Sequence, residues 1–106
     1  MEIAPRELAE RLRRGERIFL LDVRQPWEHQ LSSLQDQALI PLPELPNRID
    51  EVQPPQGAQI VCYCHHGMRS LTAAALLRDA GFANALSLAG GIDLWSRTVD
   101  PAVPRY

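Results

Sequence analysis

The sequence has 106 residues, a formal net charge of −2, 45% hydrophobic residues and 23% charged residues. This balance excludes a disordered chain, and the length suits one domain with its own core, residues 1–106. The small negative charge and the lack of any apolar run of roughly 18 residues argue against nucleic acid or membrane as partners, and the N-terminus without a signal-like segment predicts a cytoplasmic location.

The start of the chain predicts a helix followed by a buried strand. Pro5 suits a first helical turn, and Leu8 and Leu12 then fall on one face of the helix. Gly15 suits the position just past the helix end. The nearly continuous apolar run 18–23 predicts a strand that is covered on both faces.

The middle of the chain carries weaker signals because three prolines interrupt it. Residues 38–40 predict a short strand, and residues 44–52 predict a helix. Residues 54–57 contain two prolines and a glycine, so they predict a turn and not a domain boundary.

The second half of the chain alternates between apolar runs and helical patterns. The predicted elements are a strand at 58–63, a helix at 70–78 ending at Gly81, a strand at 85–88, and a helix at 92–97 after the Gly90-Gly91 turn. Alternating strands and helices predict an α/β fold with a mainly parallel sheet.

The stretch CYCHHGMRS follows the predicted strand 58–63, at the edge where open parallel sheets bind ligands. Backbone N–H groups of such a tight loop converge on its centre, and the helix that begins near Ser70 adds the positive end of its dipole. A Cys64 thiolate would be stabilised there as a nucleophile. Gly67 lets the backbone fold closely around the sulfur, and Arg69 can direct its guanidinium at an oxyanion.

Simpler roles for these side chains stay open from the residues alone. Cys62 lies inside the apolar strand and is predicted to be a buried hydrophobe. Spacing alone leaves Cys64 open between an inert strand-end thiol and a nucleophile. His65 and His66 are expected to be loop residues that shape the local electrostatic field. Met68 is expected to pack on the loop or face solvent.

A metal site and a disulfide are weaker interpretations of the same stretch. Its cysteines and histidines crowd into residues 62–66, whereas structural zinc sites usually gather ligand pairs from two stretches, and the only other histidine is His29. A Cys62–Cys64 disulfide would be strained, because the two Cα atoms of alternate strand residues lie near the upper limit of bridging distance. The sequence therefore predicts no metal.

Three stretches stand in a specific order along the chain. They are LLDVRQPWE at 20–28, the six-residue loop CHHGMR at 64–69 followed by Ser70, and LAGGIDLW at 88–95. In this order and spacing the chain resembles a single-domain rhodanese, a family of sulfurtransferases. The resemblance implies a three-layer α/β fold whose central, mainly parallel sheet of four to five strands is flanked by helices.

The resemblance also implies a two-step transferase reaction without a cofactor. Cys64 would take a sulfane sulfur as a persulfide from a donor such as thiosulfate or a thiol persulfide. It would then pass the sulfur to a thiophilic acceptor, such as cyanide, a small thiol or a protein cysteine. The substrate-binding residues implied by the resemblance are His65, His66, Gly67, Met68 and Arg69.

Other matching residues are expected to support the site without taking part in the chemistry. Asp22 and Arg24 match the family's structural motif after the first buried strand, where charge pairing is implied. Gly90 and Gly91 match the turn before the last helix, and Trp95 is expected to pack that helix onto the sheet.

Two departures from the family pattern bear on function. Residues 29–38 contain no glycine where many members have them, so the connecting loop is expected to differ in shape. The loop also has histidines where well-known thiosulfate users carry permanent charges, which weakens thiosulfate as the donor. The resemblance also implies that the six-residue loop favours sulfur over phosphate, because the related phosphatases have a loop that is one residue longer. The alternative is a non-catalytic module that senses or docks onto a persulfide-bearing partner. Residues 101–106 are expected to form a surface segment.

Overall fold

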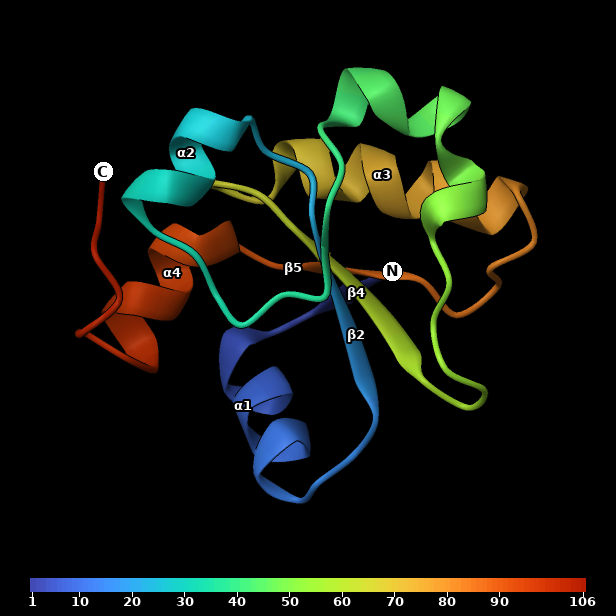
Figure 1. Ribbon diagram of the computed structural model, residues 1–106. Coiled ribbons are helices and arrows are strands. Elements are labelled where there is room, and N and C mark those ends of the chain that lie inside the picture. Colours follow the sequence, from blue (N-terminus) through green and yellow to red (C-terminus); the bar gives the residue numbers. More distant parts are fainter.

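The chain forms a three-layer structure with helices on both faces of a parallel sheet, in a computed structural model that describes residues 1–106 (Figure 1). Five strands stand in the order β1-β5-β4-β2-β3, and every neighbouring pair is parallel. The strands are β1 (Glu2–Ile3), β2 (Ile18–Asp22), β3 (Ala38–Leu39), β4 (Gln59–Tyr63) and β5 (Leu86–Leu88). The predicted α/β fold and parallel sheet are confirmed.

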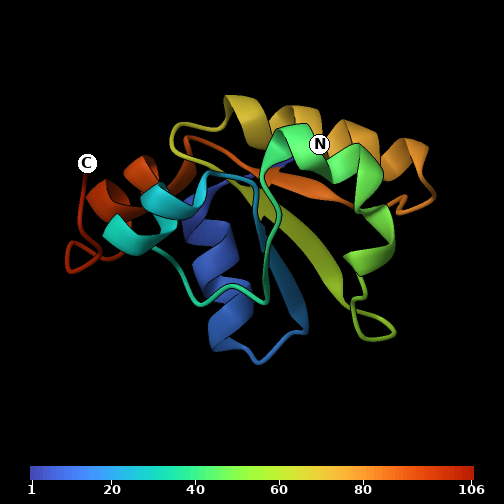
Figure 2. The same ribbon diagram turned by 45° about the horizontal axis from the view of Figure 1, so that its top comes forward.

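Helices connect these strands and cover the sheet. They are α1 (Pro5–Arg13), α2 (Pro26–Leu31), α3 (Met68–Asp79), α4 (Gly91–Thr98) and the 3-10 helices η1 (Leu42–Asn47) and η2 (Ile49–Glu51). Figures 1 and 2 show α3 and the green 42–51 segment on one side of the sheet and α1 and α4 on the other. No helix has both the length and the apolar character needed to cross a membrane.

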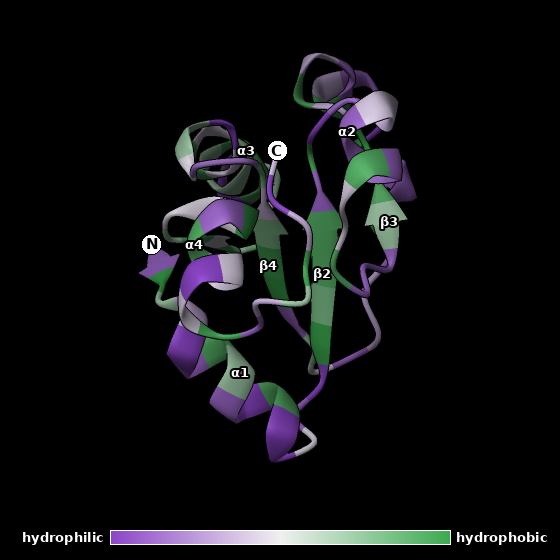
Figure 3. Cartoon of the chain, turned by 90° about the vertical axis from the view of Figure 1, so that its left-hand side faces the viewer, coloured by the Kyte–Doolittle hydropathy of each residue, from purple (hydrophilic) through white to green (hydrophobic).

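Alternate residues of β2 and β4 supply the two apolar cores. Leu21 and Cys62 face α3, whereas Leu20 and Val61 face α1 and pack with Leu8. Successive strand side chains point to opposite faces, so a strand covered on both faces needs a continuous apolar run. Figure 3 shows this run as the green colour of β2 and β4.

The segment predicted as a helix at 44–52 is instead divided into η1 and η2. Pro46 lies inside η1, has no N–H to donate and disfavours an α-helix there. The tighter 3-10 pattern accommodates it, with the Arg48 N–H donating to the Leu45 carbonyl at 3.0 Å. The Leu45 side chain is still fully buried against α3.

Three details lie outside the sequence-based predictions. The two-residue strand β1 pairs with β5 at the sheet edge. Helix α2 begins with Pro26, and the Glu28 carboxylate accepts a hydrogen bond from the Gln25 N–H at 3.1 Å. Pro at the first position and Glu three residues after the cap are start signals that could have revealed α2. Helix α3 begins at Met68, two residues before its predicted start at Ser70.

The carboxyl ends of β2 and β4 bring the sequence motifs together. Asp22 pairs in register with Tyr63, so the residues that follow the two strands emerge at the same edge of the sheet. Figure 3 shows the end of the chain, marked C, beyond the arrowheads of these two strands. This edge carries Arg24, the Cys64 loop and the last residues of the chain.

Candidate active site

Cys64 follows β4 directly, and its side chain is buried within the loop that precedes α3. Its Sγ accepts hydrogen bonds from the backbone N–H groups of Gly67 at 3.1 Å and Ser70 at 3.3 Å. The Ser70 hydroxyl lies 3.4 Å from Sγ and 2.8 Å from the Ser87 hydroxyl of β5. Two amide donors at a helix N-terminus stabilise negative charge on this sulfur.

Glycines allow the loop to close around Cys64. Gly67 has φ of +100° and precedes the first residue of α3, and Gly91 has φ of +63°. A Cβ on Gly91 would lie 2.4 Å from the His65 carbonyl oxygen, so only glycine fits there. The Ile92 N–H donates to the Cys64 carbonyl at 2.9 Å, and the start of α4 thereby holds the loop backbone.

We expect Gly67→Ala to lower the free energy of unfolding by about 2 kcal/mol. Alanine is strained at φ of +100°, and its Cβ would lie 3.0 Å from the Gly90 nitrogen. Gly81→Ala is the matched control, because Gly81 has φ of +106° and open space around it. Urea unfolding should show a larger loss for Gly67→Ala than for the control. Equal losses would mean that the close approach of Gly67 to Gly90 contributes nothing.

Arg69 forms a bidentate ion pair with Glu28, with Nη1–Oε1 at 2.7 Å and Nη2–Oε2 at 2.9 Å. The Glu28 side chain is buried, whereas the Arg69 side chain is 35% exposed. Hydrogen bonds from Arg69 and then Tyr106 lower the pKa of Glu28 to about 2, against the effect of burial. The hydrogen bond to Glu28 in turn raises the pKa of Arg69. Glu28 therefore fixes the orientation of the one arginine in the Cys64 loop.

Glu28→Gln should make the protein less stable at neutral pH and less sensitive to acid. The Glu28 pKa is depressed from 4.5 to about 2, so its contribution is complete above about pH 4.5 and is lost as pH falls through about 2. We expect a loss of about 2 kcal/mol at pH 7, discounted for the exposure of Arg69. Urea unfolding at pH 7, 4 and 2.5 measures both effects, with Glu51→Gln in an exposed ion pair as the control. Parallel pH profiles for Glu28→Gln and the wild type would contradict this role.

Asp22 and Arg24 form a fully buried ion pair behind the loop. Arg24 Nε and Nη2 donate to the two carboxylate oxygens at 2.9 and 2.8 Å. Arg24 also donates to the Ser32 carbonyl at 2.7 Å and to the Tyr106 hydroxyl at 2.9 Å. Burial opposes the charge on Arg24, but the hydrogen bonds to Asp22 and Tyr106 raise its pKa overall. Through these hydrogen bonds Arg24 connects β2, the segment after α2 and the end of the chain.

The two loop histidines stack on one another beside the end of the chain. The His65 ring lies 3.9 Å from the His66 ring and 3.9 Å from the Tyr106 ring, measured between centroids. Burial and the neighbouring His66 lower the pKa of His65, which favours the neutral form of its ring. His65 Nε2 is buried without a hydrogen-bond partner. Met68 is 78% exposed and stands at the outer side of the loop.

Cys62 lies in the core and is separate from this chemistry. Its side chain is fully buried among apolar residues, and burial raises its pKa to about 12. It is therefore a thiol at neutral pH, which makes it a poor nucleophile. Both cysteines are free.

Two groups of side chains have the spacing of metal ligands, with ligand atoms within 4.8 Å: His65 with His66 and Asp93, and Asp22 with His29 and Asp36. In the first group, Arg97 and Arg105 both pair with the Asp93 carboxylate. In the second group, Arg24 pairs with Asp22. The Asp93 and Asp22 carboxylates are already paired with guanidinium groups, so we assign them to ion pairs.

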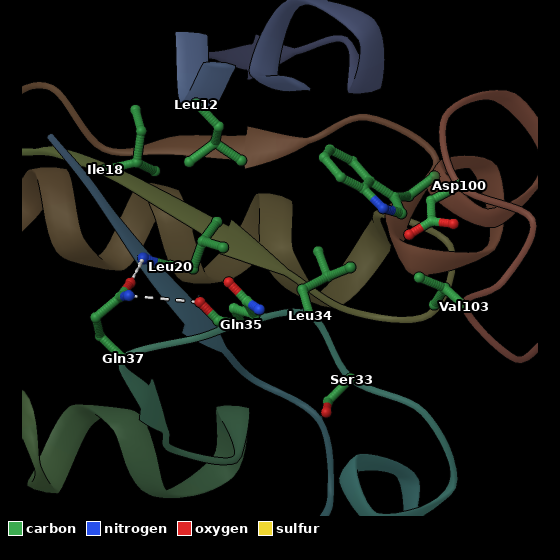
Figure 4. A pocket seen from close by; sticks show the side chains of 10 residues that line it. Leu12, Ile18, Leu20, Ser33, Leu34, Gln35, Gln37, Asp100 and Val103 are labelled. Atoms are coloured by element: carbon green, nitrogen blue, oxygen red, sulfur yellow. Dashed lines mark hydrogen bonds between the residues drawn. The ribbon is translucent and has the colours of Figure 1, made fainter. Parts of the chain in front are cut away.

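A cavity of about 560 Å³ lies away from the Cys64 loop, between α1, β2 and α4 (Figure 4). Leu20, Leu34, Trp95 and Val103 supply part of its apolar wall. No residue of the Cys64 loop lines it. Trp95 packs against the core on this face of the sheet.

The fold and the cysteine loop define a rhodanese-like domain. The family model described as "Rhodanese-like domain" matches residues 4–98, and the chain belongs to this family. The chain is 36% identical over 104 residues to the probable adenylyltransferase/sulfurtransferase MoeZ of Mycobacterium tuberculosis, covering 98% of this chain and 26% of that protein. It is 35% identical to a sulfurtransferase of Allochromatium vinosum, covering 96% of this chain and 94% of that protein. The chain thus spans about a quarter of the first curated relatives it matches.

Solved structures agree with the fold. A rhodanese-related protein from Thermoplasma volcanium has a TM-score of 0.82 at 28% identity, covering 99% of this chain and 98% of that one. The human single-domain sulfurtransferase TSTD1 has a TM-score of 0.77 at 26% identity, covering 92% and 96%. The predicted resemblance to the rhodanese family is confirmed.

Sequence reasoning missed three residues at the site. Glu28 ends the motif LLDVRQPWE, but its partner Arg69 lies 41 positions away in the chain. Ser87 and Tyr106 are likewise brought to the loop only by the folded chain. The single available signal was the acidic residue at the start of α2, which marks a helix start and not a partner for arginine.

Proposed function

We propose that this chain is a sulfurtransferase in which Cys64 carries sulfane sulfur as a persulfide. The observation that carries the proposal is the Cys64 Sγ, held at 3.1 and 3.3 Å from the N–H groups of Gly67 and Ser70 at the start of α3. Such donors stabilise a thiolate, and a loop of this kind also suits the anionic outer sulfur of a persulfide. Membership of the rhodanese-like family and the names of its sulfurtransferase relatives support the same reaction.

The proposed reaction has two displacement steps at sulfur. The Cys64 thiolate attacks the sulfane sulfur of the donor, a new S–S bond forms, and the donor's own S–S bond breaks. The leaving group is sulfite when the donor is thiosulfate and a thiolate when the donor is a thiol persulfide. The acceptor then attacks the outer sulfur and the Cys64 thiolate leaves, so cyanide becomes thiocyanate and a thiol becomes a persulfide. The protein undergoes no net oxidation.

We propose a thiol persulfide, rather than thiosulfate, as the better donor. The lowered pKa of His65 favours its neutral form, and Arg69 pairs with the Glu28 carboxylate. These two features reduce the positive charge available to a dianion such as thiosulfate. The proposed acceptor is a small thiol or a protein cysteine, with cyanide as a convenient assay acceptor. The proposed setting is the cytoplasm, and two free cysteines are in keeping with a reducing compartment.

A turnover assay tests this function. Purified protein is given thiosulfate or glutathione persulfide as the donor and cyanide as the acceptor, and thiocyanate is measured over time against protein-free controls. We expect turnover with both donors and a higher kcat/KM with glutathione persulfide. Absence of thiocyanate above the uncatalysed rate with either donor would contradict the sulfurtransferase proposal.

The second candidate function is a docking module without turnover. It is favoured by the nearly complete burial of Cys64, 1% exposed, beside two exposed apolar side chains at the same edge, Trp27 and Met68. Such a module would bind a persulfide-bearing protein through this edge. A complex that persists in Cys64→Ala, together with no turnover on any donor, would favour docking over catalysis.

A further inference from the structure

The last residue of the sequence, Tyr106, lies in the site and not with the exposed tail around it. The segment 101–106 was expected to stay on the surface, and Pro101 and Pro104 are exposed. The chain nevertheless returns to the carboxyl edge of the sheet (Figure 3), where Arg105 Nε donates to Asp93 Oδ1 at 2.9 Å. Val103 packs against the core on the way.

The Tyr106 hydroxyl bridges the two ion pairs of the site. It accepts a hydrogen bond from Arg24 Nη1 at 2.9 Å and donates one to Glu28 Oε2 at 2.7 Å. The same Oε2 atom accepts from Arg69 Nη2 at 2.9 Å. Removal of the hydroxyl would therefore leave a buried carboxylate and a buried guanidinium each short of one partner.

The Tyr106 ring makes a second and separate contact with the loop. It stacks on the His65 ring at 3.9 Å with an angle of 8° between the planes. On another side it meets Trp27 of α2 edge-on, with centroids 6.3 Å apart. The ring thus lies between the helix that carries Glu28 and the residue that follows Cys64.

We propose that Tyr106 is a positioning residue for anion binding at Cys64, acting through Glu28 on Arg69. Its hydroxyl holds the Glu28 carboxylate in the geometry that orients the Arg69 guanidinium beside the loop. Arg69 directly precedes Ser70, whose N–H donates to the Cys64 sulfur at 3.3 Å, so Arg69 belongs to the same helix start that holds the sulfur. The consequence for sulfur transfer rests on the proposed function, whereas the effect on anions approaching Cys64 does not.

Alkylation of Cys64 tests this without any turnover. Iodoacetate and iodoacetamide both lose iodide, but only iodoacetate is negatively charged. The ratio of the iodoacetate rate to the iodoacetamide rate therefore reports the electrostatic potential at the Cys64 sulfur. In Tyr106→Phe we expect this ratio to fall at least about fivefold, with the iodoacetamide rate nearly unchanged. In a Glu28→Gln background Tyr106→Phe should have little further effect. Thr98→Val, which removes an exposed hydroxyl of α4, should leave the ratio unchanged.

The same variants are then assayed with thiosulfate and cyanide. We expect Tyr106→Phe to raise KM for thiosulfate at least about fivefold with kcat nearly unchanged, which a general loss of folding would not do.

An unchanged alkylation ratio in Tyr106→Phe, or an equal loss of rate with both alkylating reagents, would overturn the proposal. An effect seen only in Tyr106→Leu would also overturn it, because the ring and not the hydroxyl would then be responsible. A shifted ratio in a protein whose wild type has no turnover would support the role of Tyr106 and contradict the sulfurtransferase proposal.

Discussion

Cys64→Ala is expected to lower sulfur transfer by at least about a thousandfold, to the rate of the uncatalysed reaction. The reason is that Cys64 is the only sulfur with backbone N–H donors aimed at it, and the persulfide forms on that atom in the proposed reaction. The measurement is thiocyanate formation from glutathione persulfide and cyanide, with thermal unfolding to confirm that the variant is folded.

Cys62→Ala is the matched control for this loss. It removes the other cysteine of the chain, whose thiol is buried in the core with its pKa raised to about 12. We expect turnover within about twofold of the wild type and a stability loss of about 1 kcal/mol from the smaller core side chain. Full activity in Cys64→Ala combined with lost activity in Cys62→Ala would show that the nucleophile has been assigned to the wrong cysteine.

Arg24→Met is expected to cost about 3 to 5 kcal/mol of unfolding free energy, the largest stability effect of a single substitution proposed for this chain. Asp22 is fully buried, and without Arg24 its charge would lose two hydrogen bonds at 2.8 and 2.9 Å. The Ser32 carbonyl and the Tyr106 hydroxyl would lose a donor as well. Urea unfolding at pH 7 measures the loss.

A double variant separates the buried charge from the lost packing. Asp22→Asn removes the charge that Arg24 balances, so Asp22→Asn with Arg24→Met should be more stable than Arg24→Met alone. His29 Nδ1 and the Tyr63 hydroxyl also contact Asp22, at 2.9 and 3.2 Å, so the recovery should be partial. A loss below about 1 kcal/mol in Arg24→Met would contradict the importance assigned to this ion pair.

The architecture could be predicted from sequence because its signals are local. The apolar runs that became β2 and β4 and the alanine-rich pattern of α3 each specify an element without knowledge of the rest of the chain. Predictions failed where the local signals were weak, as at residues 44–52, where the predicted helix contains Pro46 and the chain forms 3-10 turns instead. They also failed for β1, whose two residues are too few to form a pattern.

The site was predictable only in part, for a related reason. The position of Cys64 after a buried strand and before a helix follows from neighbours in sequence, and so does the backbone around its sulfur. The partners that set charge come from distant positions: Glu28 lies 41 residues from Arg69, and Tyr106 lies 78 residues from Glu28. Side-chain partners at such separations are decided by the fold, so Arg69 was expected as an anion binder without the carboxylate that orients it.

The central claim is that Cys64 carries sulfur, and intact-protein mass spectrometry tests it most directly. Wild type, Cys62→Ala and Cys64→Ala are each incubated briefly with glutathione persulfide, and separately with thiosulfate, and then with cyanide. We expect wild type and Cys62→Ala to gain the mass of one sulfur atom and to lose it with cyanide, while Cys64→Ala gains none. No gain in wild type from either donor, or an equal gain in Cys64→Ala, would contradict the persulfide mechanism.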